Sequence, residues 1–115
     1  MKVIIAGGRT FDNYAMLCES CDRTLSLQSE IEIVSGTANG ADKLGERYAI
    51  ERGFTVKQFP ADWDKHGKSA GYKRNEEMAQ YADALIAFWD GKSKGTKHMI
   101  DLANLYKLKV KVVNF

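Results

Sequence analysis

The fold is decided by residues 31–42, which read IEIVSGTANGAD. The run begins with a short segment rich in β-branched residues, which favour strands, and continues into a polar turn that contains Gly36 and Gly40. A helical pattern follows from about Ala41 and stops at Gly53. A strand, a glycine turn and a helix in this order form the first part of a βαβ unit, which predicts a parallel sheet.

The same alternation extends outward over the whole chain. Further strands are predicted at 2–6, 54–59, 84–89 and 109–113. Further helices are predicted at about 13–28, 70–81 and 96–106, with an irregular loop at 61–69. Right-handed crossovers then give a single α/β domain over residues 1–115, Rossmann-like, with a five-stranded parallel sheet and helices on both faces. The last strand is expected near an edge because its lysines alternate with valines.

The composition narrows the class of protein. The chain has 115 residues, 44% of them hydrophobic and 28% charged, which is typical of one globular domain. No apolar run approaches the roughly 20 residues of a membrane span, and the N-terminus enters a strand directly, so we expect a cytoplasmic protein without a membrane partner. The net charge of +2 argues against a nucleic-acid partner, because duplex binding needs many phosphate contacts.

Two cysteines, Cys18 and Cys21, are spaced as C-x-x-C, a pattern of redox sites and of zinc sites. Both fall on the apolar stripe of the predicted helix at 13–28, together with Leu17 and Leu25. The second ligand pair that a zinc site would need is lacking. We therefore interpret both cysteines as core residues.

Four predicted strands end in glycine-rich or polar segments, and ligands of parallel sheets bind beyond these carboxyl ends. Glycines let a ligand approach the backbone, and the helix N-terminus that follows favours an anion. Neither a G-x-G-x-x-G fingerprint nor a Walker A loop is present. We expect a phosphorylated nucleotide derivative to be bound by Gly7, Gly8, Arg9, Ser35, Gly36, Thr37, Ala38, Gly40, Asp42, Arg74, Asn75, Ser93, Gly95 and Thr96.

Several of these residues have alternative roles. Arg9 and Arg74 could each form charged hydrogen bonds to a phosphate or ribose, whereas Asp42 could instead cap its helix. Trp63 and Trp89 are candidates for stacking on a base or for packing at the rim of the core. The sequence requires no cofactor, although Mg²⁺ could be held through a phosphate by aspartates that follow the strands, namely Asp62, Asp64 and Asp90.

The motifs resemble those of the SLOG superfamily, which groups the LOG phosphoribohydrolases, the DNA-processing protein DprA and the YspA-like proteins. The segment 7–12, GGRTFD, is similar to the opening motif of the small YspA-like branch. The segment 35–42 is similar to a motif shared with DprA, and 74–79, RNEEMA, resembles the LOG helix that carries a functional arginine. The segment 93–96, SKGT, resembles an altered form of the P-G-G-x-G-T phosphate loop.

The resemblance implies a phosphate-binding cradle and leaves catalysis open. At the position of the LOG glutamate that serves hydrolysis, this chain has Met99, so no catalytic residue is assigned. The first hypothesis is a sensor or sequestering module for a nucleotide derivative. The alternatives are a phosphoribohydrolase-like hydrolase and a DprA-like nucleic-acid-binding protein, and Met99 favours the first hypothesis over the hydrolase. The LOG relatives further imply a homodimer.

Overall fold

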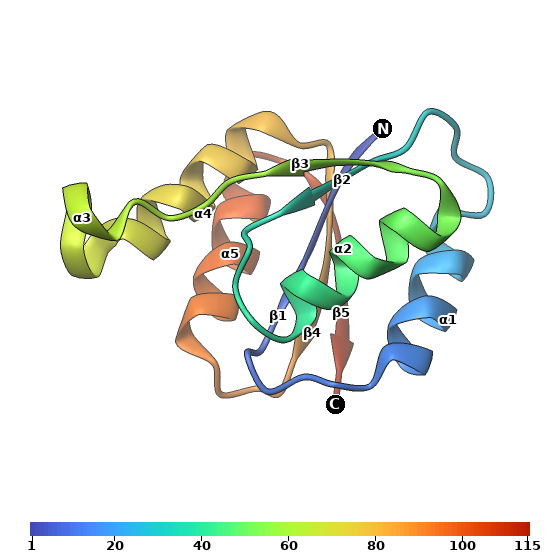
Figure 1. Ribbon diagram of the computed structural model, residues 1–115, viewed down its shortest axis with the longest axis horizontal. Helices are drawn as coiled ribbons and strands as arrows, with labels where there is room; N and C mark the ends of the chain where they lie inside the picture. Colours follow the sequence, from blue (N-terminus) through green and yellow to red (C-terminus); the bar gives the residue numbers. More distant parts are fainter.

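The structure, a computed structural model, describes residues 1–115 and alternates strands with helices throughout (Figure 1). In chain order the elements are β1 (Lys2–Gly7), α1 (Tyr14–Leu25), β2 (Glu32–Ser35), α2 (Ala41–Arg52), β3 (Thr55–Gln58), α3 (Trp63–His66), the 3₁₀ turn η1 (Gly67–Ser69), α4 (Ala70–Tyr81), β4 (Ala84–Trp89), α5 (Lys94–Leu105) and β5 (Lys109–Asn114). None of the helices combines the length and the apolar character needed to cross a membrane.

All five strands are parallel and lie in the order β3-β2-β1-β4-β5. The first strand of the chain is therefore central, with Ile4 opposite Val34 of β2 on one side and Leu85 of β4 on the other. The chain builds outward to β3 and then returns to place β4 beside β1. The predicted five-stranded parallel sheet is confirmed, and β5 lies at an edge as its alternating lysines indicated.

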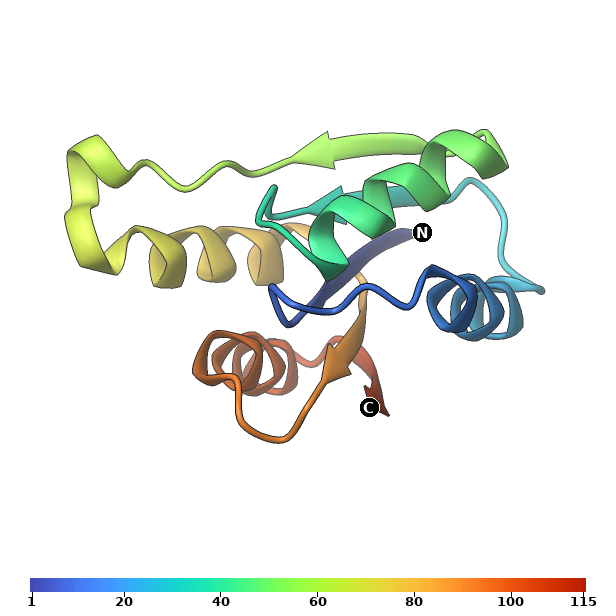
Figure 2. The same ribbon diagram turned by 60° about the horizontal axis from the view of Figure 1, so that its bottom comes forward.

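Helices cover both faces of the sheet, as predicted. Side chains that alternate along β1 point to opposite faces, so Ile5 packs with Leu17 of α1 and Tyr48 of α2 in one core. Ile4 packs with Met78 of α4 and Met99 of α5 in the second core. Figure 2 shows the two helix pairs on opposite sides of the strands. These two cores hold the carboxyl ends of the strands in a fixed arrangement.

Helix α1 ends three residues before the predicted limit. Asn13 caps its start, with the side-chain oxygen accepting a hydrogen bond from Met16 N at 3.0 Å. Leu25 is its last buried apolar residue, while Leu27 is 95% exposed, so packing gives no reason to extend the helix. The cysteines are free, and burial raises the pKa of the Cys21 thiol to about 12, which agrees with a core role.

The segment 61–69 is not the irregular loop that the sequence predicted. Asp62 accepts a hydrogen bond from Lys65 N at 3.1 Å and starts the short helix α3, which the 3₁₀ turn η1 joins to α4. No residue of α3 or η1 is buried, so no apolar periodicity announces these turns in the sequence. The segment extends away from the sheet beside the start of α4 (Figure 1).

Candidate functional site

Three adjoining hollows of about 430, 480 and 90 Å³ lie at the carboxyl edge of the sheet, and we call them together the cleft. Arg9 and Arg74 line all three hollows. The cleft lies where the winding of the sheet reverses, between β1 and β4, as expected for this class of fold. The predicted residues that line it are Gly7, Gly8, Arg9, Gly36, Thr37, Ala38, Asp42, Trp63, Arg74, Asn75, Ser93, Gly95 and Thr96.

Three predicted site residues do not line the cleft. Ser35 is buried, donates a hydrogen bond to Glu46 Oε2 at 2.6 Å and accepts one from Thr37 N at 3.1 Å. Trp89 donates its indole N–H to the carbonyl of Ser93 at 3.1 Å and packs against the core of α4 and α5. Gly40 lies against the backbone of Gly8 and Arg9. Each of these residues has a structural task within the protein.

Gly40 and Gly7 allow backbone segments to approach one another closely. A Cβ atom on Gly40 would lie 2.2 Å from the carbonyl oxygen of Gly8, and its φ of +79° is a conformation that glycine alone adopts freely. A Cβ atom on Gly7 would lie 2.4 Å from the carbonyl oxygen of Phe88. By contrast, a Cβ atom on Gly95 would have no neighbour within 4 Å, so this backbone is open to a ligand.

The guanidinium group of Arg74 is held in place from two sides. Its Nη1 donates to the carbonyl of Gly36, and its Nε donates to Asn75 Oδ1 at 3.0 Å. Burial lowers its pKa, an effect that the nearby carboxylate of Asp42 opposes. Since a guanidinium carries five N–H donors, the other donors remain available to an anion in the cleft.

The side chain of Asn75 forms hydrogen bonds both to the guanidinium group of Arg74 and to the first turn of α5. The side chain is 7% exposed, and its oxygen accepts the hydrogen bond from Arg74. Its Nδ2 donates to the carbonyl of Gly95 at 3.4 Å and lies 3.2 Å from Nδ1 of His98. Both ends of this amide are engaged within the protein, so we assign Asn75 a positioning role at the wall of the cleft.

Asp42 lies at the floor of the smallest hollow and is 6% exposed. Its Oδ2 accepts a hydrogen bond from Ala38 N at 3.1 Å, and the N-cap position of α2 belongs to Gly40 instead. Burial raises the pKa of this carboxyl to about 6, partly offset by that hydrogen bond and by the charge of Arg74. The side chain of Asp42 therefore does not cap α2, and it lines the cleft.

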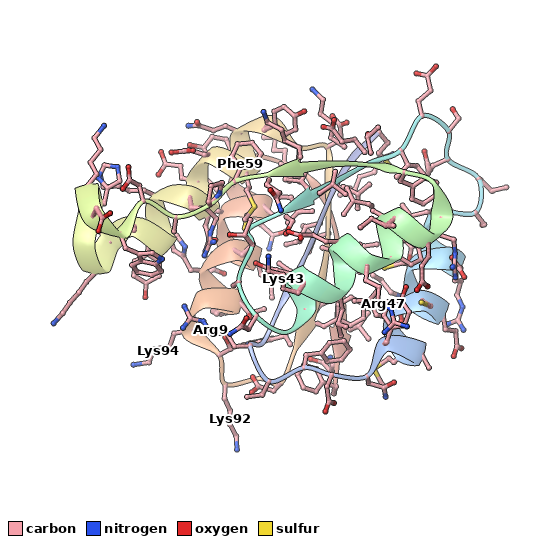
Figure 3. All side chains as sticks on the ribbon, viewed as in Figure 1. Arg9, Lys43, Arg47, Phe59, Lys92 and Lys94 are labelled. Atoms are coloured by element: carbon pink, nitrogen blue, oxygen red, sulfur yellow. The ribbon has the colours of Figure 1, made fainter.

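The N-terminus of α5 forms the opposite wall. Ser93 is the N-cap, and its Oγ accepts from Thr96 N at 3.3 Å. Asp90 accepts hydrogen bonds from Lys92 N and Ser93 N, which hold the pKa of its carboxyl below the usual range. The N–H groups of the first helical residues have no intrahelical partner and can bind an anion. Figure 3 labels Arg9, Lys92 and Lys94 at this end of the molecule.

The remaining candidates from the sequence are Met99, the aspartates proposed to hold Mg²⁺, and Trp63. Met99, at the position of the LOG glutamate, is 1% exposed and belongs to the core of α4 and α5. Asp62 and Asp90 act as caps for backbone N–H groups, and no three His, Cys, Asp or Glu side chains gather where they could hold a metal ion. Trp63 is 52% exposed at the rim of the cleft and offers an aromatic face.

Lys68 and Tyr72 are among the cleft residues that sequence reasoning missed. Tyr72 precedes Asn75 by three positions on α4, which is the spacing of one helix face, whereas Lys68 lies in the 3₁₀ turn η1. Tyr72 is 48% exposed and packs edge-to-face on His98, with 4.5 Å between the ring centroids. The predicted loop at 61–69 contains Lys68, whereas Tyr72 lies in the predicted helix at 70–81 and could have been found from its spacing to Asn75.

Comparison with known proteins gives two sequence matches. Residues 1–66 match the family model YAcAr, described as the YspA, cpYpsA-related SLOG family. The chain is also 35% identical over 121 residues to the Gene 61 protein of Mycobacterium phage D29, an alignment that covers 99% of this chain and 95% of the phage protein. The matched family segment includes β1, β2 and β3 with the two turns that contribute Arg9 and Gly36 to the cleft.

Two solved structures share the fold. DNA processing protein A (DprA) from Streptococcus pneumoniae matches 99% of this chain with a TM-score of 0.77 at 18% identity. The same protein from Helicobacter pylori matches 97% with a TM-score of 0.70 at 21% identity. The chain spans 50% and 64% of the two structures, respectively.

The expectation that a nucleic-acid partner is unlikely is wrong. The Helicobacter pylori structure describes a single-stranded DNA binding mode, so this fold serves a protein that binds nucleic acid. The net charge of the chain was a poor guide, because a single strand is bound by a local groove of cations and aromatic rings rather than by a uniformly basic surface. Here Arg9, Lys68 and Arg74 gather in one cavity.

Proposed function

This chain belongs to the YspA, cpYpsA-related SLOG family, and from that premise we propose that it binds a phosphorylated nucleotide derivative in the cleft, as a sensor or sequestering module. The observation that carries the proposal is the position of Arg9 and Arg74, which come from distant segments and line all three hollows. Two arginines that converge on one cavity favour an anionic ligand.

The cleft offers groups for each part of such a ligand. Arg74 is preset by its bonds to Gly36 and Asn75, which reduces the entropy lost when it binds a phosphate. The first turn of α5 adds backbone N–H donors beside Gly95, where the surface is open. The exposed rings of Trp63 and Tyr72 line the same cavity and can stack on a base.

We expect AMP, ADP and ADP-ribose to raise the melting temperature, whereas adenosine at the same concentration does not. The reason is that the arginines of the cleft bind the phosphate group, which adenosine lacks. A ligand that binds only the folded state stabilises that state by mass action. Thermal shift measurements over a panel of phosphorylated nucleotides and bare nucleosides test this. A panel in which no phosphorylated compound shifts the transition would contradict the proposal.

We expect Arg74→Ala to weaken binding of the nucleotide found in that panel by about tenfold or more, because a hydrogen bond to a charged group is worth roughly 1.5–3 kcal/mol. Arg23→Ala is a matched control, since Arg23 lies on α1 with 74% of its side chain exposed and bonds only to Glu19. Isothermal titration calorimetry compares the two variants. Equal affinities for both would place the phosphate away from Arg74.

A second candidate function is the binding of single-stranded nucleic acid. A groove of about 490 Å³ lies beside the cleft and shares Tyr72 and Ser93 with it. Its lining combines lysines with aromatic rings, which suits successive phosphates and bases: Tyr72, Trp89, Lys92, Lys94 and Lys97. The likeness to a DprA that binds single-stranded DNA supports this candidate at the level of the fold.

Fluorescence anisotropy with 5′-labelled oligonucleotides of increasing length separates the two candidates. A site for a single nucleotide gives an affinity that does not depend on length. A strand that continues along the groove gives an affinity that rises with length and falls when Lys92 and Lys94 are replaced by alanine.

A further inference from the structure

Asp42 is the one carboxylate at the floor of the cleft, and a phosphate ligand does not explain it. The side chain is 6% exposed and lines the hollow of about 90 Å³ together with Arg74. An ionised carboxylate accepts hydrogen bonds and repels a phosphate, so it is the wrong group for binding one. Asp42 nevertheless lines the same hollow as Arg9 and Arg74, whose N–H donors favour an anion. A group of the ligand other than the phosphate is therefore needed to interact with the carboxylate.

One oxygen of Asp42 has no hydrogen-bond partner within the protein. Oδ2 accepts from Ala38 N at 3.1 Å, while Oδ1 accepts from no donor. No fully buried side-chain oxygen or nitrogen in the structure lacks a partner, so Oδ1 is open to the hollow that Asp42 lines. An accessible carboxylate oxygen on an otherwise buried side chain can accept a hydrogen bond from a ligand donor in this hollow.

We propose that Asp42 accepts a hydrogen bond from a sugar hydroxyl, so that the ligand class of the cleft is a ribonucleoside phosphate with free ribose hydroxyls. This inference rests on the proposed function and adds the chemical group that the floor of the cleft selects. In this arrangement the carboxylate of Asp42 binds the sugar, and Arg9 and Arg74 bind the phosphate.

The size of the inner hollow supports this assignment. A volume of about 90 Å³ has room for roughly three water molecules, so only one edge of a ligand enters it. The adjoining hollow of about 430 Å³ holds Arg9, Lys68 and Arg74 and has room for a phosphate. Its carboxylate, Asp90, accepts hydrogen bonds from two backbone N–H groups at Oδ1 and, unlike Asp42, is exposed to solvent.

The short separation between the side chains of Asp42 and Arg74 favours a hydroxyl of the sugar as the donor. A Cβ atom placed on Gly36 would lie 2.8 Å from Asp42 Oδ2 and 2.9 Å from Nη1 of Arg74, so carboxylate and guanidinium flank the same point. The ligand must therefore present a donor close to its phosphate. In a nucleoside 5′-phosphate the ribose hydroxyls lie nearer to the phosphate than the amino group of the base.

The experiment compares the dissociation constants of AMP, 2′-deoxy-AMP, 3′-deoxy-AMP and 2′,3′-dideoxy-AMP by calorimetry at pH 8, where Asp42 is ionised. We expect the dideoxy compound to bind the wild-type protein about tenfold or more weakly than AMP, because a charge-assisted hydrogen bond is lost. Of the two monodeoxy compounds, the one that lacks the bound hydroxyl carries most of this loss.

The variant Asp42→Asn tests the residue itself. An asparagine keeps an oxygen that can accept from Ala38 N, so the loop is retained, but the charged acceptor is gone. We expect the ratio of the AMP and dideoxy-AMP constants to shrink to roughly threefold or less, since a neutral hydrogen bond is about half as strong. Arg23→Ala should leave the ratio unchanged.

The outcomes separate this inference from the proposed function. If AMP and dideoxy-AMP bind equally well to the wild-type protein, the inference is overturned and nucleotide binding stands. If no phosphorylated nucleotide of the thermal-shift panel binds, both fail. If another nucleotide of the panel binds in place of AMP, its deoxy form takes the place of the deoxy-AMP compounds in the same comparison. Purine riboside 5′-phosphate, which lacks the amino group of AMP, completes the set, and a loss of affinity there that Asp42→Asn abolishes would show that the donor is the base instead.

Discussion

Asp42→Asn is expected to raise the free energy of unfolding at pH 8 by up to about 3 kcal/mol, although the residue lies in the candidate site. Burial raises the pKa of Asp42 from 3.8 to about 6 in the folded protein, and each pKa unit corresponds to about 1.4 kcal/mol. The ionised carboxylate is therefore less stable in the folded chain than in the unfolded one. Asparagine carries no charge and avoids this cost.

The pH dependence has a definite sign. Between pH 3.8 and about 6 the folded protein binds the proton more tightly than the unfolded chain, so the contribution of Asp42 to stability falls as pH rises. The cost is absent below this window and complete above it. Urea unfolding of both proteins at pH 5 and pH 8 should show a stability difference that is larger at pH 8.

Asp64→Asn is the matched control, because Asp64 is an exposed carboxylate on α3. A difference between wild type and Asp42→Asn that is the same at both pH values would mean that Asp42 titrates normally. Loss of ligand affinity together with a gain in stability would mark Asp42 as a residue retained for binding at the expense of the fold.

Gly40→Ala is expected to destabilise the protein by about 3 kcal/mol or more, which combines a steric and a conformational cost. The added Cβ atom would lie 2.2 Å from the carbonyl oxygen of Gly8, and this contact is between two backbones that cannot rotate away. At φ +79° and ψ −128°, Gly40 also occupies a region that other residues avoid. To relieve this overlap, the loop between β2 and α2 would have to move away from the loop between β1 and α1.

Gly53→Ala separates these two costs. Gly53 also has a positive φ, of +75°, but a Cβ atom there would have no neighbour within 4 Å. We expect this variant to lose only about 1 kcal/mol from the left-handed conformation. Urea unfolding measures both variants, and similar losses for the two would show that the contact between the loops contributes little.

The sequence was sufficient for the architecture where apolar residues recur regularly. The strand predicted at 84–89 is β4 from end to end, because its apolar residues are buried on both faces of a central strand. The predicted stop at Gly53 is the left-handed cap of α2. The helix at 63–66 was missed because none of its residues is buried and Asp62, which accepts a hydrogen bond from Lys65 N, is the one side chain that caps it.

For the site, the sequence predicted which residue types gather at the strand ends. It did not predict which of them line the cleft and which hold the loops in place. Ser35 and Gly40 belong to the same turn as Gly36, yet their roles depend on Glu46 and on Gly8, and such contacts leave no mark in the sequence. Asn75, which was predicted to bind the ligand, also joins Arg74 to α5 through contacts that only the packed helices reveal.

The central position of β1 has a consequence for how a ligand acts on the whole molecule. Lys2, at its start, is bonded to Asp83, 81 positions away, and β1 joins the half of the chain that carries Arg9 to the half that carries Arg74. Opening of this junction would separate the two arginines, so a ligand that both arginines bind must be released before the sheet can open there. Its binding energy therefore protects the amide hydrogens of both sheet halves from exchange with solvent by the same factor.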